Sequence, residues 1–431
     1  MSKFIKIWLP ALLAMLLLSG CGMKTVDQLY CLPKRSEADN DLVAVINEAM
    51  EGLSFSTPVY GENRLTVQAA DLDGDNVDEY LVFARDNSEK PLKILIFCQL
   101  ASGYVLMDTI EGFGLSFDFV EYAQVDDRPG VEIIVGRQVN DRVARSVSVY
   151  RFSNGVSRQL LTTGYSRLST CDLDEDGQKE LFILNYGTAD NGNGLVNVFK
   201  YTDGELKRTA EQSISSNSLG FERFTEGRLH DGRKAVFVTC EGEDQELVTD
   251  IFIMEAGILH PVANGVISPS LQGYSVFPWD VDGDGVLEMA RTVTVPSAEA
   301  ARQTQLLQWY SLDSAGNETM KQCTFHTYDE GWFLEIPKEY LTRISIEPME
   351  DATRFCLLEG KRQILMFTMR ALTGADKEAE AKLEGRVVLY KGDAVIYTVE
   401  ITEEAEDMQI TADIISNVFH PIRAELMTEE D

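Results

Sequence analysis

Three nine-residue segments of the chain place carboxylate side chains at the same alternate positions of a turn-forming sequence. The segments are DLDGDNVDE from Asp71, DLDEDGQKE from Asp172 and DVDGDGVLE from Asp280. Each has acidic residues at positions 1, 3, 5 and 9, and position 6 is Asn or Gly, which adopts a left-handed backbone at low cost. Converging hard oxygen donors are what calcium requires, so the pattern predicts calcium-binding loops.

Each predicted loop offers four carboxylates, with the backbone carbonyl of position 7 as a further ligand. The predicted ligands are Asp71, Asp73, Asp75, Val77 and Glu79 in the first loop, Asp172, Asp174, Asp176, Gln178 and Glu180 in the second, and Asp280, Asp282, Asp284, Val286 and Glu288 in the third. A single copy is also explained as an acidic, solvated turn, since Asp and Gly are ordinary turn residues. Three copies in one register favour about three structural calcium ions.

The sequence after each loop argues against an EF-hand. An EF-hand loop carries a bidentate carboxylate at position 12, whereas these loops have Val82, Ile183 and Arg291 there. The following segments YLVFA, LFILNY and MARTVTV are typical of β-strands. In these loops the chain resembles the FG-GAP or VCBS repeat family of calcium-binding β-propellers, over about residues 64 to 325. All three loops end in Glu where that family more often has Asp.

The spacing of the loops indicates further, degenerate copies. The intact loops start at residues 71, 172 and 280, so they are 101 and 108 residues apart, about twice the ~50 residues of a four-stranded blade. AQVDDRPGVEIIVGR, with Glu132 at position 9, and EGRLHDGRKAVFVT, with Ala235 there, lie between them. Arg128 in one copy, and Arg233 and Lys234 in the other, supply positive charge, so we expect both loops to be metal-free.

The predicted fold is mainly β: a β-propeller of about five, possibly more, four-stranded blades over residues 64–326. A C-terminal α+β domain is expected over residues 327–431, with helices near 373–384 and 409–418 and a solvated acidic stretch at Glu403 to Asp407. As an alternative, some of its strands complete the propeller. Residues 21–63 are predicted to form a tether and a lead-in helix near residues 37 to 50, where apolar residues recur at helical spacing.

The N-terminal residues are typical of an export signal. Residues 1–20 carry Lys3 and Lys6 followed by an apolar run too short for an ordinary membrane span. The run ends in Leu-Ser-Gly before Cys21, which resembles a bacterial lipobox, and this resemblance implies that Cys21 is lipidated and becomes the mature N-terminus. We therefore expect a lipoprotein anchored to the cell membrane on its extracytoplasmic face.

The composition supports a folded and strongly acidic body. Of the 431 residues 44% are hydrophobic, which is ample for a core, and the formal charge is −32. Signal cleavage would change the charge to −34, because two lysines leave and no acid leaves with them. Such a surface excludes a nucleic-acid partner. Six cysteines beyond Cys21 show no CxxC spacing, and no disulfide is assigned.

Catalytic signatures are largely missing from the sequence. It contains no HExxH, GxSxG, GxxxxGK[ST] or dinucleotide GxGxxG motif. The four histidines, His230, His260, His326 and His420, are expected on the surface or in capped loops, and the tryptophans mainly in the core. We therefore expect a binding module for an unknown extracellular protein or glycan, not an enzyme. The alternatives are a carbohydrate-active lyase or hydrolase on a propeller scaffold, or an envelope scaffold protein.

Overall fold

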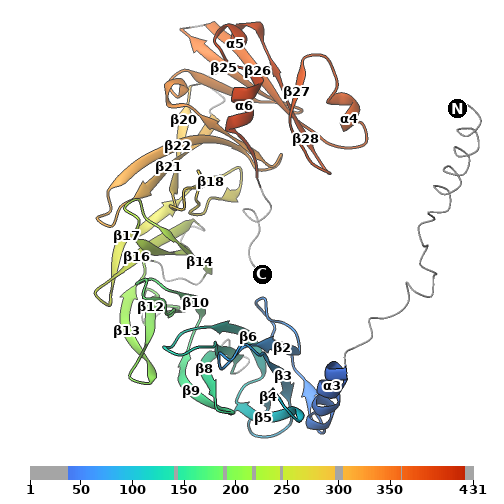
Figure 1. Ribbon diagram of the computed structural model, residues 1–431. Helices are drawn as coiled ribbons and strands as arrows, with labels where there is room; N and C mark the ends of the chain where they lie inside the picture. The colour runs from blue at the N-terminus through green and yellow to red at the C-terminus, as the bar shows by residue number, and fades with distance from the viewer. Residues whose placement is uncertain are drawn as a thin grey trace, which may run out of the picture.

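Antiparallel β-sheets form most of the protein, as the computed structural model in Figure 1 shows. The structure describes residues 37–139, 144–187, 192–215, 220–242, 246–296, 304–360 and 362–422. Within these residues the strands form six main sheets, here numbered 1 to 6 in chain order, and one small hairpin.

Sheets 1 to 4 follow one plan of four consecutive antiparallel strands, each next to the one before it. Sheet 1 has in addition a short strand at residues 54–55, which is not counted among its four. Sheet 1 contains β1 (Ser54–Phe55), β2 (Val67–Ala70), β3 (Glu79–Arg85), β4 (Leu92–Leu100) and β5 (Gly103–Gly112). Sheet 2 contains β6 (Ser116–Ala123), β7 (Glu132–Gln138), β8 (Arg145–Ser153) and β9 (Val156–Gly164). Sheet 3 contains β10 (Arg167–Cys171), β11 (Glu180–Asn185), β12 (Leu195–Thr202) and β13 (Glu205–Ser213). Sheet 4 contains β14 (Gly220–Arg228), β15 (Lys234–Glu241), β16 (Leu247–Glu255) and β17 (Ile258–Ser268).

The C-terminal sheets depart from this order. The hairpin β18 (Ser270–Leu271) and β19 (Tyr274–Ser275) precedes sheet 5, which contains β20 (Met289–Val295), β21 (Thr304–Leu312), β22 (Glu318–Thr327), β23 (Trp332–Ile336) and β29 (Phe419–Pro421). Sheet 6 contains β24 (Ile344–Pro348), β25 (Thr353–Glu359), β26 (Arg362–Leu372), β27 (Arg386–Lys391) and β28 (Ile396–Ile401). The expected domain boundary between residues 326 and 327 falls inside sheet 5, because it lies within β22, which pairs with β23, and β23 pairs in turn with β29.

The five loops, intact and degenerate, all precede the second strand of a sheet or its equivalent. In sheets 1 to 4 each loop joins the first two strands, as the predicted repeat requires. In sheet 5 the first strand is reduced to a single bridge between Trp279 and Glu288, on either side of the third intact loop. The sequence repeat therefore corresponds to a structural repeat of one loop per sheet.

Each sheet is buried between its neighbours in the chain. One face of sheet 1 shares a hydrophobic core with sheet 2, where the rings of Phe83 and Phe117 meet edge to face at 5.2 Å. Equivalent cores join sheets 2 and 3, 3 and 4, 4 and 5, and 5 and 6. Apolar residues therefore fill both faces of the inner strands, which explains why these strands read as continuous apolar runs.

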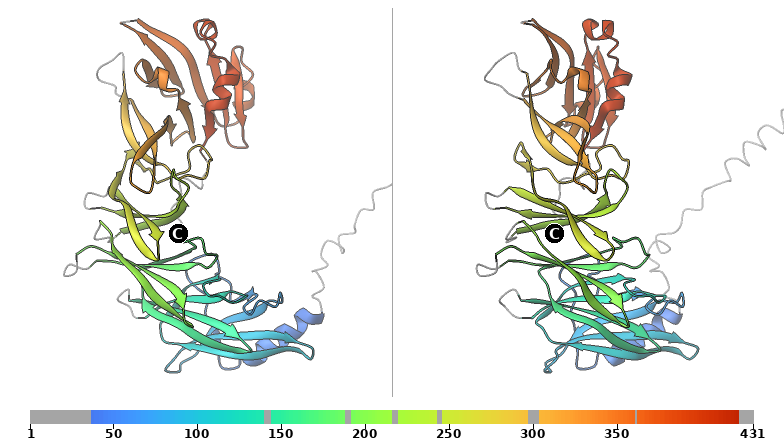
Figure 2. Two further views of the ribbon diagram at one scale, coloured as in Figure 1. Left: turned by 60° about the vertical axis from the view of Figure 1, so that its left-hand side comes forward. Right: turned by 90° about the vertical axis from the view of Figure 1, so that its left-hand side faces the viewer.

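The stack of sheets forms an open arc and does not close into a ring (Figures 1 and 2). The predicted lead-in helix is α3 (Glu37–Ala49), and its Leu42 and Ile46 pack on the outer face of sheet 1 against Val82 and Phe97. In a closed propeller this face would meet the last blade. Because α3 covers it, the sheets do not close into a ring, and the predicted propeller is not confirmed.

Short helices accompany sheet 6: a single 3-10 turn, η1 (Lys338–Tyr340), and the helices α4 (Lys377–Glu380), α5 (Glu403–Asp407) and α6 (Ala412–Val418). Helices α4 and α6 lie within the predicted helical segments. The acidic stretch forms α5, capped by the Thr402 side chain; its four acidic residues are exposed, as predicted, whereas Ala405 is fully buried. Ala405 sits in the core shared by sheets 5 and 6, which explains the order of this charged segment.

Four features of the predicted N-terminal region lie outside the described residues: the signal sequence, the tether up to residue 36, Cys21 and Cys31. Within the described part of the chain, no helix has the length and apolar character needed to cross a membrane.

Candidate metal centres

Position 9 of the loops is a buried glutamate with one oxygen tied to the backbone. Glu79 Oε2 accepts a hydrogen bond from Leu72 N–H at 2.9 Å, and Glu180 and Glu288 accept the same bond from position 2 of their own loops. All three side chains are at most 4% exposed. Their second carboxylate oxygen therefore faces the acidic cluster.

Position 1 organises the turn. In the first loop the two carboxylate oxygens of Asp71 accept from Gly74 N–H at 2.7 Å and from Asn76 N–H at 3.0 Å. Asp172 and Asp280 close the second and third loops in the same way, each accepting from the backbone of positions 5 and 6. The backbone is left-handed at position 6, as the sequence predicts, and also at position 4, where Glu175 has φ 58°.

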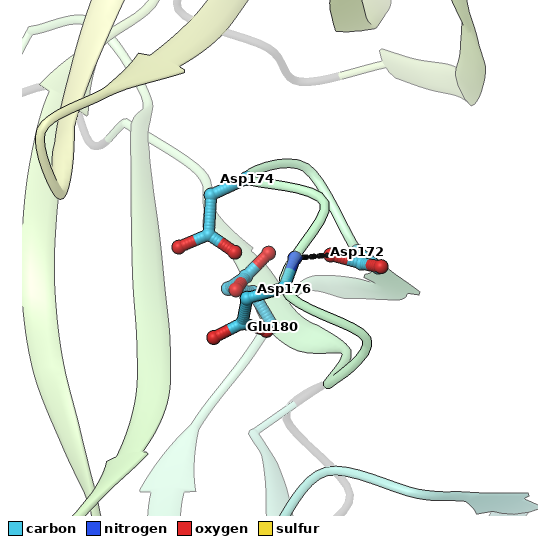
Figure 3. A group of neighbouring side chains, drawn as sticks. All are labelled: Asp172, Asp174, Asp176 and Glu180. Atoms are coloured by element: carbon cyan, nitrogen blue, oxygen red, sulfur yellow. Dashed lines mark hydrogen bonds between the residues drawn. The ribbon is translucent and has the colours of Figure 1, made fainter.

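The carboxylates come together to different extents in the three loops. In the second loop, Asp172, Asp174, Asp176 and Glu180 each place one oxygen within 4.8 Å of the others. Figure 3 shows these four side chains, with the Asp176 N–H donating to Asp172. The first and third loops bring together three of the four predicted acids, at positions 1, 3 and 9.

The position-5 acids that remain outside these clusters bond within their own turns. Asp75 Oδ1 accepts from Val77 N–H at 2.8 Å, and Asp284 Oδ1 accepts from Val286 N–H at 2.9 Å. In the second loop Gln178 N–H donates to Asp176 in the same way. The proposed role of the three position-7 carbonyls as metal ligands stays a prediction.

A lysine ammonium group reaches into the second loop. Lys200 Nζ lies 2.8 Å from Asp176 Oδ2 and 3.1 Å from Glu180 Oε1, and it also contacts Asp174. These ion pairs raise the pKa of Lys200 against the effect of its burial. The third loop has the same arrangement from another strand, since Lys321 Nζ on β22 contacts Asp284 and lies 3.2 Å from Asp282 and 3.7 Å from Glu288.

The first loop differs from these two. Among the described residues no Lys or Arg nitrogen lies within 4.0 Å of its acids. The nearest side chain from the third strand of its sheet is Cys98, and burial followed by the charges of the loop raises the pKa of its thiol to about 12. Cys98 is therefore a neutral thiol beside three acidic side chains, Glu79, Asp73 and Asp75.

Arg151 neutralises the first degenerate loop, whereas the sequence favoured Arg128. Arg151 on β8 forms an ion pair with Asp126 and lies 3.8 Å from Glu132, and all three residues are at most 5% exposed. The Arg128 contribution is its backbone, which donates to Asp126 at 2.7 Å. Sequence spacing within one loop could not reveal a cation from a strand that comes later in the chain.

The second degenerate loop carries no acidic cluster among the described residues. Here Arg233 pairs with Glu255 at 3.5 Å, and Lys234 Nζ donates to the Asp172 carbonyl of the preceding loop at 2.8 Å. Position 9 is the buried Ala235, which packs with Ile253 in the core of sheets 4 and 5. The two cations therefore contact Glu255 and the preceding loop, and not an acidic cluster in their own loop.

Neighbouring loops are joined in a row. Val131 N–H donates to the Asp71 carbonyl at 3.2 Å, and Lys179 N–H donates to the Gln124 carbonyl at 3.1 Å. Each bond runs from position 8 of one loop to position 1 of the loop before it, and Leu287 N–H continues the row to the Arg228 carbonyl at 2.9 Å. The loops pack so closely that a Cβ on Gly74 would lie 2.4 Å from Pro129.

The donor set fits a hard divalent cation. Glu180 Oε1 and Glu288 Oε1 are buried and point into their clusters, where their described cationic neighbours are the ammonium groups of Lys200 and Lys321. Burial, with repulsion from neighbouring acids, raises the pKa of Glu79, Glu180 and Glu288 to about 7 each. Buried carboxylates that crowd one another are stabilised by a cation that takes oxygen ligands. These clusters could therefore hold metal ions.

The other residues with possible chemistry lie in structural positions. His326 is a buried strand residue, not a surface one: burial lowers its pKa to about 3, and its ring stacks on Phe333. Trp309 and Trp332 are core residues, as predicted. Within the described residues, Cys98, Cys171, Cys240, Cys323 and Cys356 form no disulfide.

Comparison with known proteins identifies no family for this chain. No family model matches it. No curated protein matches it either. Among solved structures it is similar to the crystal structure of rhamnogalacturonan lyase YesW, at 14% identity and a TM-score of 0.34, over 86% of this chain and 68% of the other. A likeness at this level carries no argument about fold or activity.

Proposed function

We propose that this protein is a calcium-stabilised binding module built from repeated sheets, with no catalytic activity of its own. The observation that carries the proposal is the convergence of three or four carboxylates around one buried glutamate, held by the backbone of position 2, at the same place in three loops. Calcium, when bound, supplies positive charge to these carboxylates, a charge that the second and third loops otherwise receive from Lys200 and Lys321. When calcium is bound, the intact loops fix the turn that leads into the second strand of sheets 1 and 3 and into β20 of sheet 5.

We also propose that the sheets are diverged blades of the FG-GAP or VCBS type. Two features support this: the loops lie between the first two strands of consecutive sheets, and hydrogen bonds join them in a row, three links through the backbone and one through the Lys234 side chain. The open arc leaves the strand edges and loop surfaces of the stack for an extracellular protein or glycan. The strongly acidic surface favours a neutral or cationic partner.

Removing calcium is expected to destabilise the protein. At calcium concentrations of ~10 times the Kd, each loop contributes about 1.4 kcal/mol, so a chelator should lower Tm by roughly 5 °C. Calorimetric scans of the mature chain with EDTA, and after adding back excess calcium, measure this shift. Magnesium is the matched control, because it binds poorly to sites without octahedral geometry. A Tm that does not respond to EDTA would reduce the loops to acidic turns.

We further propose that Cys21 carries the lipid that anchors the module to the cell membrane, outside the cytoplasm. The prediction is that the wild-type chain appears in the membrane fraction with an acyl mass on its first residue, whereas Cys21→Ser does not. Cys31→Ser is the matched control and should stay membrane-bound. Equal fractionation of wild type and Cys21→Ser would contradict the anchor without affecting the metal proposal.

A further inference from the structure

One position on the third strand of each sheet faces position 9 of the loop. The residue after position 9 pairs with the third strand, as in Tyr80 with Phe97 and Leu181 with Phe199. In antiparallel strands the residue opposite position 9 is therefore the next one along the third strand, and its side chain lies on the same face. In sheets 1 to 5 these residues are Cys98, Arg151, Lys200, Ile253 and Ser311.

The charge at this position matches the charge of the loop in sheets 2 to 4. Arg151 faces two buried acids, and its guanidinium lies 4.9 Å from the centre of the Tyr201 ring. Ile253 faces the loop whose position 9 is alanine, and both side chains are buried in one core. Lys200 faces an intact acidic loop, where its ammonium contacts the acids at positions 3, 5 and 9.

The two remaining intact loops differ at this position. Ser311 is small, and Lys321 from the neighbouring strand β22 supplies the ammonium of the third loop in its place. Cys98 brings no charge to the first loop, and among the described residues no Lys or Arg nitrogen lies within 4.0 Å of the acids of that loop. The first loop is thus the intact one whose described surroundings leave its acids uncompensated.

An internal ammonium and a divalent cation need the same oxygens. The Lys200 and Lys321 side chains are 22% and 16% exposed, so both reach solvent and can withdraw along flexible stems. Arg151 is only 6% exposed and is held by the Tyr201 ring, so it stays in place. Calcium must therefore displace a lysine ammonium in the second and third loops, but only the neutral Cys98 thiol beside Glu79 in the first.

We propose that these side chains set a hierarchy of calcium affinity: the Cys98 loop is the tight site, and Lys200 and Lys321 weaken the other two. This inference rests on the proposed calcium function and adds how the affinity of each loop for calcium is set. The first sheet is then held at low calcium, and sheets 3 and 5 are stabilised only as calcium rises. Arg151 makes the loop of sheet 2 independent of calcium.

Calorimetric titration of the EDTA-stripped mature chain with calcium tests the hierarchy. The wild type should show one tight and two weaker sites, and Asp73→Asn should abolish the tight one. Lys200→Met and Lys321→Met should each tighten one weak site by about tenfold, and Cys98→Lys should weaken the tight site to a similar extent. Lys207→Met, which removes an exposed lysine paired with Asp203 outside the loop, is the control and should change nothing.

The outcomes separate the two proposals. Three sites of equal affinity that ignore Lys200→Met and Lys321→Met would overturn the hierarchy and leave calcium binding intact. Absence of calcium binding in the wild type and in both methionine variants would overturn the proposed function itself. The methionine variants keep the test decisive if Cys98→Lys does not fold, because methionine retains the apolar stem that packs beside the loop.

Discussion

Replacing Arg151 with methionine is expected to lower the free energy of unfolding by about 3–5 kcal/mol, because it leaves two buried carboxylates without their cation. Asp126 is fully buried and Glu132 is 3% exposed. Methionine keeps most of the side-chain volume beside Tyr201, so the loss reports charge and not a cavity. Urea unfolding of wild type and variant at pH 7.5 measures the difference.

The loss caused by Arg151→Met should depend on pH. Burial raises the pKa of Glu132 to about 7, above the value near 4.5 that it has when exposed. A carboxyl with a raised folded-state pKa favours folding fully below pH 4.5, and this contribution is lost as the pH rises through 7. Loss of the Arg151 cation should raise the folded-state pKa of Glu132 further, so the variant should be closest to wild type near pH 5 and furthest from it above pH 7.

Lys200→Met is the matched control, since it removes the cation at the equivalent position of sheet 3. That site is more exposed, and calcium can replace the ammonium, so in excess calcium the variant should unfold within about 1 kcal/mol of wild type. An Arg151→Met variant that is rescued by calcium would show that the degenerate loop still binds metal. A loss below 1 kcal/mol would show that Arg151 is not the counter-ion.

The sequence predicts the loops well because each depends on contacts within nine residues. The acids at position 1, the left-handed position 6 and the strand after position 9 are all set by neighbours along the chain. The spacing of the repeat also predicted the positions of the two degenerate loops, which lie between the expected strands. The helix α3 was also predictable, because Leu42 and Ile46 recur at helical spacing.

Other features depend on contacts between strands distant in the sequence, and these were not predictable from the loops alone. Arg151 and Lys200 follow position 9 of their loops by 19 and 20 residues, a spacing that becomes a signal only once the strand pairing is known. Ring closure depends on what covers the outer face of sheet 1, and α3 takes that place. Likewise, β29 joins sheet 5 from the far end of the chain.

The core between sheets 5 and 6 makes the C-terminal third of the chain one folding unit, so Trp332→Ala should destabilise both sheets together. Trp332 is fully buried in sheet 5, where its indole N–H donates to Glu330 at 2.7 Å. Its ring centre lies 6.4 Å from that of Phe355 in sheet 6 and 6.0 Å from that of Phe419 on β29. Removing a buried tryptophan of this kind costs about 3–5 kcal/mol.

Hydrogen exchange with peptide resolution measures this coupling: protection of β22 and of β25 should fall by the same amount in Trp332→Ala. Phe113→Ala is the aromatic control, because Phe113 is 57% exposed and its loss should cost no more than about 0.5 kcal/mol. Loss of protection confined to sheet 6 would instead mark it as an independent domain. If the two sheets respond together, a fragment beginning at residue 327 should not fold, because it separates β23 from its partner β22 and opens their shared core.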